Sequence, residues 1–184
     1  IRPRVASAAD CQSWRCLSWV DAAVWFFVLF LLFPVWRSFH LYCIHRALHI
    51  PVLYKHVHAL HHRNINVGPW SGLSMHPVEH LIFLGSVVVH FVVAAHPVHI
   101  LFHLQYYALT AATTHTGFEG MVIKDKNRVK LGTFHHQMHH RYFECNYGSL
   151  ELPWDKWFGS FHDGTVESDA KIRERRKKLA NGAS

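Results

Sequence analysis

Histidine is the residue type in this chain with the clearest capacity for chemistry, because most of its copies lie in short clusters. The 184-residue sequence contains 19 histidines. On a helix, side chains at positions i, i+3 and i+4 share one face, so each cluster directs two or three imidazoles at one point. The clusters consist of His45 and His49, of His58, His61 and His62, and of His136, His139 and His140. Neutral imidazole is a common ligand of iron, zinc and copper. Because the clusters offer more nitrogen atoms than one ion needs, the pattern predicts a two-metal centre.

Two further histidines are candidates for the same centre. His115 follows an apolar segment within the sequence Thr-His-Thr-Gly, and His76 precedes the apolar segment before that one. Both are expected on the side of the chain that carries the clusters. The other histidines are interpreted as structural, because histidine pairs at helical spacing also arise by chance in a histidine-rich chain. Polar neighbours orient imidazole ligands through the second ring nitrogen, and we prefer Asn146 and Glu144 for that task.

The apolar residues are concentrated in three segments, which predicts a membrane protein. Half of the chain is hydrophobic and only 17% is charged. Residues 22–36 contain neither a charge nor a histidine, and residues 81–95 and 98–114 contain no charged side chain. A hydrocarbon core of about 30 Å takes about 20 helical residues, and each segment approaches that length with its flanks. We therefore predict an all-α fold: an integral membrane helical bundle with a cytosolic, histidine-rich metal-binding cap. The alternative is a soluble domain with a buried helical core.

The order of the segments places the histidine clusters on one side of this bundle. A helix over residues 18–49 would be about 48 Å long at about 1.5 Å per residue, so its last turns extend beyond the bilayer. A short helix over 52–62 carries the second cluster. The next two apolar segments form a hairpin that turns at His96-Pro97 and returns to the starting side. There a helix over 135–140 carries the third cluster.

The chain is long enough for one domain, which we place at residues 18–161. Residues 1–17 are predicted to be irregular, residues 120–134 to form a basic linker, and residues 162–184 to form a polar, basic tail. The sequence begins without Met and without a signal peptide. We therefore expect a fragment that lacks upstream sequence, including any upstream transmembrane helix.

The distribution of charge favours a cytoplasmic location for the clusters. The net charge is +7 with histidine counted as neutral. Lysine and arginine flank the apolar segments on the cluster side, whereas the tip of the hairpin carries none, as the positive-inside rule requires. The basic run at residues 171–178 is interpreted as a tail near anionic lipid, so no nucleic-acid partner is expected. The four cysteines form no CxxC pair, which indicates free thiols in a reducing compartment.

The order and spacing of these motifs resemble the sterol desaturase and fatty acid hydroxylase superfamily of membrane, histidine-rich di-iron enzymes. The resemblance covers residues 38–161 and implies that residues 18–161 form a fatty acid hydroxylase-like membrane domain. The matching segments are Tyr42–His49, Tyr54–His62, His76–Glu79, His115–Gly117, His136–His140, Asn146–Gly148 and Trp154–Ser160.

The resemblance implies two bound iron ions and O2 as co-substrate, with zinc able to replace iron during expression. It implies hydroxylation or desaturation of an unactivated C–H bond in a sterol or fatty-acyl lipid that enters from the bilayer. It also implies reduction by a separate cytochrome b5-like or ferredoxin-like protein. No catalytic side chain is implied beyond the metal ligands. Carried over by position, these ligands are His45, His49, His58, His61, His62, His76, His115, His136, His139 and His140.

Two other functions stay open on the sequence alone. A membrane metal transporter places its ligands near the middle of the bilayer, where this chain offers His90. A non-catalytic zinc or iron protein is the other alternative, although zinc favours four ligands and the clusters supply more. The sequence selects neither the lipid, nor hydroxylation over desaturation, nor the oligomeric state.

Overall fold

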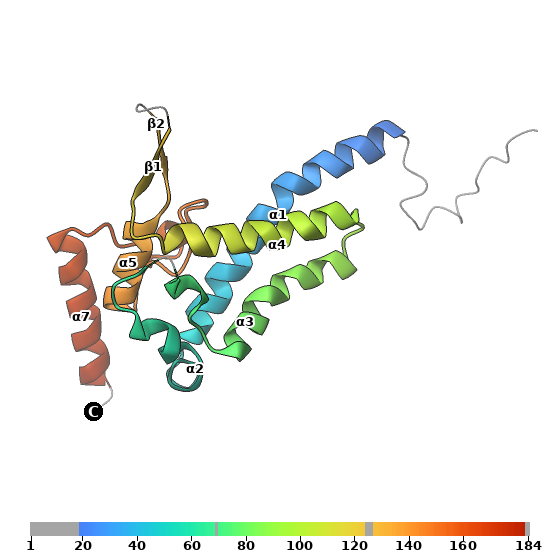
Figure 1. Ribbon diagram of the computed structural model, residues 1–184. Coiled ribbons are helices and arrows are strands. Elements are labelled where there is room, and N and C mark those ends of the chain that lie inside the picture. The colour runs from blue at the N-terminus through green and yellow to red at the C-terminus, as the bar shows by residue number, and fades with distance from the viewer. Residues whose placement is uncertain (1–18, 69, 124–126, 183–184) are drawn as a thin grey trace, which may run out of the picture.

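The computed structural model describes residues 19–68, 70–123 and 127–182, and most of these residues are helical (Figure 1). The described chain begins with α1 (Trp19–Leu48), which matches the long helix predicted over residues 18–49. Within the described residues, Asp21–Leu48 is the one helix that is long and apolar enough to cross a membrane. The irregular segment predicted at residues 1–17 lies outside the described residues.

The predicted hairpin is present, and its two legs lie beside α1 (Figure 1). The first leg is α3 (Pro77–Leu84), which continues as the 3₁₀ helix η5 (Gly85–Phe91), and the second leg is α4 (Pro97–Thr114). The first leg is therefore 15 residues long, short of the roughly 20 residues that span a bilayer at right angles. Of the three spans predicted, the described chain shows one that qualifies by length and composition.

Both legs of the hairpin begin at a His-Pro pair. The Nδ1 atom of His76 accepts a hydrogen bond from the backbone N–H of Val78, and that of His96 accepts one from Val98. Each imidazole thus caps an N–H group that has no partner inside the helix. Proline suits the first helical position because it lacks that N–H group. The two His-Pro pairs therefore fix where the legs start.

Polar bonds join α4 to the helices beside it. The imidazole of His99 donates from Nε2 to the carbonyl oxygen of Phe26, at 2.9 Å. The imidazole of His103 bonds Ser86 at 3.0 Å and His90 at 3.1 Å. These contacts support the structural interpretation of the histidines in the apolar segments.

The predicted helix over 52–62 is divided into two elements. The first is α2 (Pro51–His56), and the second is the 3₁₀ helix η3 (His58–Arg63). The division falls at Val57, whose φ of −123° is far from helical values. Side chains three residues apart eclipse one another in a 3₁₀ helix. The rings of His58 and His61 accordingly lie one beside the other, 5.5 Å apart and inclined by 27°. A further 3₁₀ turn, η4 (Ser71–Leu73), precedes α3.

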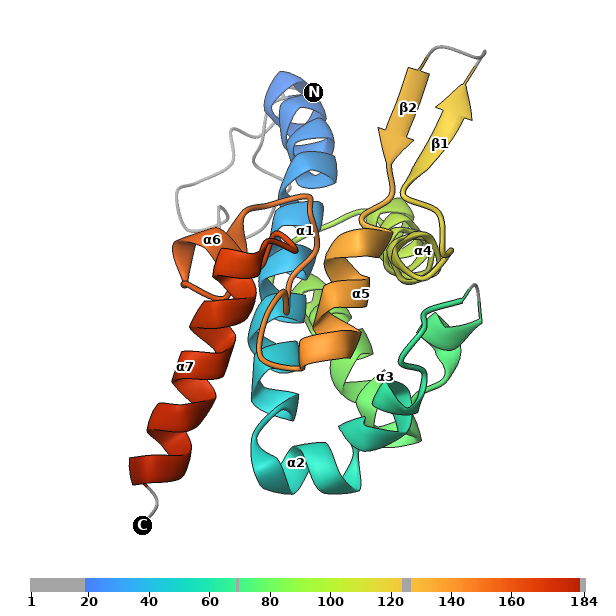
Figure 2. The same ribbon diagram turned by 90° about the vertical axis from the view of Figure 1, so that its left-hand side faces the viewer.

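A β-hairpin replaces part of the basic linker predicted at residues 120–134. Strands β1 (Gly120–Ile123) and β2 (Asn127–Lys130) pair antiparallel, with Gly120 opposite Lys130. Figure 2 shows the hairpin projecting from the helical body. The described chain is mostly helical, as predicted, and this hairpin is a local departure from the all-α class, because β-branched residues such as Val122 and Val129 favour extended backbone.

The last third of the described chain supplies three more helices. The predicted helix over 135–140 lies within α5 (Thr133–Tyr142), and the short α6 (Trp154–Trp157) follows. The tail predicted to be merely polar forms α7 (Val166–Gly182). It is attached to the body by the buried Ile172 and by an ion pair between Arg176 and Glu144 at 2.9 Å.

The distribution of polar and apolar side chains is the reverse of that in a typical soluble domain. Many fully buried side chains are polar, and histidine is the commonest of them. Large apolar side chains on α1, η5 and α4 are exposed, for example Leu31 at 73%, Phe91 at 90% and Leu101 at 62%. Such exposed apolar area is expected where lipid or another protein covers the surface.

Candidate metal centre

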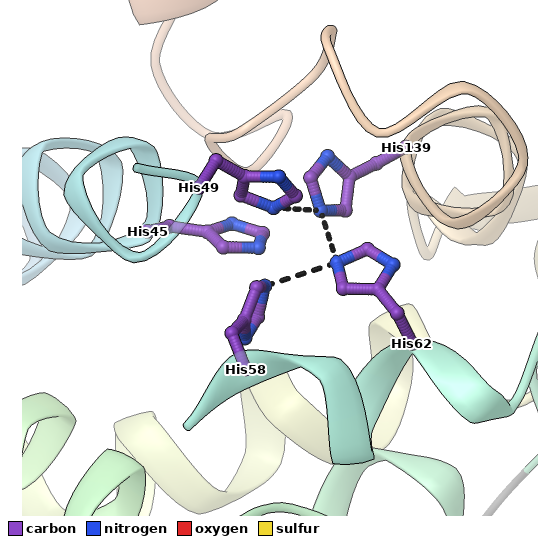
Figure 3. Close-up of side chains that lie close together, drawn as sticks. All are labelled: His45, His49, His58, His62 and His139. Atoms are coloured by element: carbon purple, nitrogen blue, oxygen red, sulfur yellow. Dashed lines mark hydrogen bonds between the residues drawn. The ribbon is translucent and has the colours of Figure 1, made fainter. Parts of the chain in front are cut away.

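Nine of the ten predicted ligands converge at the end of α1, in two groups. Within each group, one nitrogen atom from every member lies within 4.8 Å of those from all the others. The first group, shown in Figure 3, consists of His45, His49, His58, His62 and His139. The second group consists of His61, His115, His136 and His140. The groups together supply nine imidazoles, which is enough for two metal ions.

Four separate segments contribute to these groups. His45 lies in the last turn of α1, and His49 is the residue that directly follows the helix. The 3₁₀ helix η3 and α5 each supply three histidines. His115 follows the last residue of α4, where it terminates the helix. Neither group forms from one segment, so the centre exists only in the folded chain.

The first group is held by close approaches between Nε2 atoms. The Nε2 atom of His62 lies 3.0 Å from that of His58 and 3.1 Å from that of His139 (Figure 3). The Nε2 atom of His139 also lies 3.2 Å from that of His49. His58, His62 and His139 are buried, so these nitrogen atoms converge away from water.

The second group adjoins the first. The Nε2 atom of His136 lies 2.8 Å from that of His115 and 3.0 Å from that of His140. The ring of His140 lies 4.6 Å from the ring of His61 and 4.7 Å from that of His62, measured between centroids. Because His62 belongs to the first group, the two candidate metal positions are neighbours.

Backbone carbonyl groups orient four of the nine imidazoles. A carbonyl oxygen can only accept a hydrogen bond, so the Nδ1 atom facing it carries the proton. In a neutral ring, Nε2 then keeps its lone pair. The four bonds join His45 to Tyr147 (2.7 Å), His61 to Ser74 (3.3 Å), His115 to Ala111 (2.8 Å) and His139 to Cys145 (2.6 Å). All four rings therefore direct lone pairs towards the centre.

A carboxylate orients a fifth imidazole. Glu79 lies 2.7 Å from the Nδ1 atom of His58, and both side chains are fully buried. A carboxylate on the outer nitrogen of a histidine is a frequent companion of metal ligation, because it fixes the ring and raises its basicity. Glu79 is one of the polar residues that lie close in sequence to the clusters, although our preference was for Asn146 and Glu144. The His76-Pro-Val-Glu79 motif, which starts α3, was the signal that could have found it.

Three residues predicted for the metal site make contacts outside the two histidine groups. His76 caps α3 and belongs to neither group. The amide of Asn146 bonds the backbone of His162 through both its oxygen and its nitrogen. The carboxylate of Glu144 pairs with Arg176. Among the described residues, neither Asn146 nor Glu144 hydrogen-bonds an imidazole of the two groups. The side chain of Asn146 instead secures the loop after α5, where its own φ is +55°.

Burial keeps the clustered imidazoles neutral at pH 7. Loss of hydration lowers the pKa of His49 to about 2, of His140 to about 3 and of His115 to about 4. The same cause holds the pKa of His136 and His139 well below the ordinary value, and neighbouring imidazoles lower both further. The neutral form is the one that binds metal ions. The environment therefore prepares these side chains for ligation.

The nitrogen atoms of the centre fit a pair of metal ions. The Nε2 lone pair of His139 faces two other Nε2 atoms, and the Nε2 lone pair of His115 faces the Nε2 atom of His136. Lone pairs repel one another unless a proton or a cation lies between them. Imidazole suits iron, zinc and copper alike, whereas a single zinc ion favours four ligands. Nine neutral imidazoles in two adjacent groups thus match two first-row transition metal ions.

The low pKa values predict that the metal-free chain loses stability in mild acid. In the unfolded chain histidine binds a proton below about pH 6.5, whereas in the folded chain His49, His115 and His140 stay neutral to about pH 4 or lower. The unfolded state then binds more protons, so the free energy of unfolding falls by about 1.4 kcal/mol per pH unit for each such histidine. Thermal unfolding of metal-free protein between about pH 7 and about pH 4.5 checks this. A midpoint that does not fall across this range contradicts it.

Comparison with known proteins gives the family of this chain. A model of the family described as fatty acid hydroxylase matches residues 30–160, a range that contains all nine converging histidines. The chain belongs to the fatty acid hydroxylase family. The resemblance predicted from the histidine motifs is confirmed, and the match extends from within α1 to the start of the loop after α6.

Curated relatives of this fatty acid hydroxylase family chain are named as sterol desaturases or as a lathosterol oxidase. Lathosterol oxidase of Rattus norvegicus is 35% identical over 130 residues, which cover 69% of this chain and 43% of the relative. The Delta(7)-sterol 5(6)-desaturase of Candida albicans is 31% identical over 171 residues, which cover 89% of this chain and 42% of the relative. The Delta(7)-sterol 5(6)-desaturase of Saccharomyces cerevisiae is 31% identical over 138 residues, which cover 74% of this chain and 37% of the relative. The chain thus spans less than half the length of each of these three relatives. No solved structure matches it.

Proposed function

We propose that this chain holds two iron ions and uses O2 to hydroxylate or desaturate an unactivated C–H bond of a lipid. The observation that carries the proposal is the pair of adjacent imidazole groups, buried and neutral, at one end of α1. Membership of the fatty acid hydroxylase family supports it. The names of the relatives favour a sterol as the lipid, and desaturation as the reaction.

We further propose that α1 and the hairpin of α3, η5 and α4 lie in a membrane. The length and hydropathy of α1 support this, as do the exposed apolar side chains of all these helices. The histidine groups would then lie at the membrane surface. Exposed Arg46, Arg63 and Arg141 lie close in sequence to the ligands, which favours the cytoplasmic side.

The residues of the chain have three tasks in this proposal. The nine imidazoles of the two groups hold the metal ions, and bound iron would supply the activation of O2 and the acceptance of electrons. Backbone carbonyl groups keep their rings in position and the outer nitrogen atoms of those rings protonated, and Glu79 positions the ring of His58. Burial of the groups excludes water from the reacting centre. A cavity beside the imidazoles, lined by His45, His58 and His61 among others, gives a substrate access to them.

Electrons would come from a separate protein. An acidic partner is favoured by the exposed arginines that lie close in sequence to the ligands, Arg46, Arg63 and Arg141. A cytochrome b5-like or ferredoxin-like donor has suitable chemistry. We propose such a donor for the cytoplasmic face.

The test of this function is iron content together with conversion of a sterol. The chain is expressed with iron, purified in detergent and analysed for metals, with two iron ions expected per chain. It is then incubated with lathosterol, a reducing system and O2, and the sterols are separated by gas chromatography and mass spectrometry. We expect a product two mass units lighter or sixteen heavier, and none without O2. A chain that binds metal tightly when expressed with iron but changes no lipid would establish the metal-binding alternative.

A further inference from the structure

A cavity of about 60 Å³ connects the metal centre with a set of polar side chains on α1, α4 and the loop after α5. Its wall includes imidazoles of both groups, such as His45 and His115. Apolar side chains such as Leu41 and Phe83 also line it. We use the name polar end for four of its polar residues: Arg37, Tyr107, Thr110 and Ser149. Arg37 lies eight positions before His45 on α1, or about 12 Å along the helix axis. The polar end is therefore separated from the ligands by a short, defined distance.

Arg37 is a buried cation whose hydrogen bonds are incomplete. Its exposed fraction is 2%. Its Nη1 atom reaches Glu151 at 3.5 Å, which is long for a hydrogen bond. Its Nε atom has no hydrogen-bond partner among the described residues. The guanidinium also lies 5.7 Å from the ring centres of Tyr106 and Tyr107. Because a buried donor without an acceptor is unfavourable, an oxygen atom of a ligand in the cavity would complete this site.

The charge at the polar end favours a neutral oxygen. The carboxylate of Glu151 offsets the charge of Arg37 and accepts hydrogen bonds from Thr110 at 3.2 Å and Ser149 at 3.0 Å. An anionic ligand would bring a second negative charge next to this carboxylate. A hydroxyl group brings none, and it can accept a bond from Arg37 while it donates to an oxygen nearby. The polar end thus matches a hydroxyl group better than a carboxylate or a phosphate.

We propose that the polar end binds the hydroxyl group of the lipid substrate, and that Arg37 determines specificity for lipids that carry one. The proposal rests on the proposed function, which it deepens. A space of about 60 Å³ holds on the order of five water-sized groups. Only one end of a lipid fits, so the carbon that reacts lies a few bonds from the hydroxyl group. A sterol meets this requirement, because its hydroxyl group stands on the terminal ring next to the second ring. The interior of a fatty-acyl chain does not.

The test compares binding of two sterols that differ by one oxygen. Lathosterol and its 3-deoxy analogue compete with tritiated lathosterol for the chain in detergent micelles. The original chain is expected to favour lathosterol by about tenfold or more, the size of one hydrogen bond to a charged group. Arg37→Gln is expected to reduce this preference to about threefold or less. Arg46→Gln is the matched control, because Arg46 lies on the same helix, is exposed and bonds Tyr42 outside the cavity. It should leave the preference unchanged.

A second variant keeps the test decisive if Arg37→Gln does not fold. Glu151→Gln retains Arg37 but removes the charge that offsets it, so the affinity for lathosterol 3-sulfate relative to lathosterol should rise by about tenfold. An unchanged ratio in both variants overturns the proposal, as does an original chain that favours the sulfate. If the chain oxidises lathosterol with iron and O2 while these ratios do not move, the Arg37 proposal fails and the proposed function stands. If the ratios move and no oxidation occurs, the sterol site stands and the oxygenase function fails.

Discussion

Replacement of His139 by alanine should remove at least one iron ion from the chain and lower lipid oxidation by on the order of 1000-fold. His139 is fully buried and its Nε2 atom contacts those of both His49 and His62. Its Nδ1 atom is fixed by the carbonyl oxygen of Cys145, so its lone pair cannot turn away from the centre. No other imidazole of the first group makes two such contacts and a carbonyl bond together. Metal analysis of the purified variant and lathosterol conversion measure the two effects.

The control for this experiment is His56→Ala. His56 ends α2, is exposed and belongs to neither group. We expect it to retain two iron ions and full conversion. If His139→Ala also retained two iron ions with the same affinity, the first group could not be a metal site, and the proposed function would lose its principal support.

Asp155→Asn should lower both the stability of the fold and the affinity for iron, although Asp155 belongs to neither group. This buried carboxylate accepts hydrogen bonds from the backbone N–H groups of Tyr147 and Gly148, both at 2.8 Å, and from Ser160 at 2.7 Å. It thereby holds the loop whose Tyr147 carbonyl orients His45. Loss of these charge-assisted bonds should reduce the free energy of unfolding by about 3 kcal/mol. Looser support for His45 should weaken iron binding by about 10- to 100-fold.

Denaturant unfolding and iron competition with a chelator measure these two effects. Asp163→Asn is the matched control, because Asp163 is exposed and bonds only Thr165 and Ser168 at the start of α7, in the part of the chain that the structure describes. It should leave iron affinity unchanged. An Asp155→Asn chain that is less stable but binds iron as tightly as before would show that this carboxylate supports the fold alone. The role of the loop in positioning His45 would then be wrong.

Much of the site could be predicted from local spacing. Positions i and i+4 share a helix face in any sequence, so His136 and His140 had to point the same way once α5 formed, and His49, directly after α1, stays beside His45. The length of α1 and the position of the hairpin followed from runs of apolar residues and from the His-Pro pairs. The family followed from the order of the same motifs, and it is confirmed.

Other features depend on contacts between distant residues. Residues 58–62 look like one helical face in the sequence, yet His58 and His62 join the first group whereas His61 joins the second. The division depends on which rings approach from other segments: His49 and His139 lie beside His62. His115 and His140 lie beside His61. The choice of Glu79 over Asn146 and Glu144 also required the fold, because α3 must pack against η3 to bring this carboxylate to His58.

The sequence by itself determined the kind of chemistry, since the number, type and spacing of the histidines fix which ligands are available and which of them point together. Only the tertiary structure decided how the imidazoles divide between two sites and which atoms orient them. The physical reason is that four of the orienting partners are backbone carbonyl groups, which every residue possesses and no sequence distinguishes. Their positions, and the cavity that joins Arg37 to the metal centre, exist only after segments as far apart as His45 and Tyr147, 102 residues, have packed together.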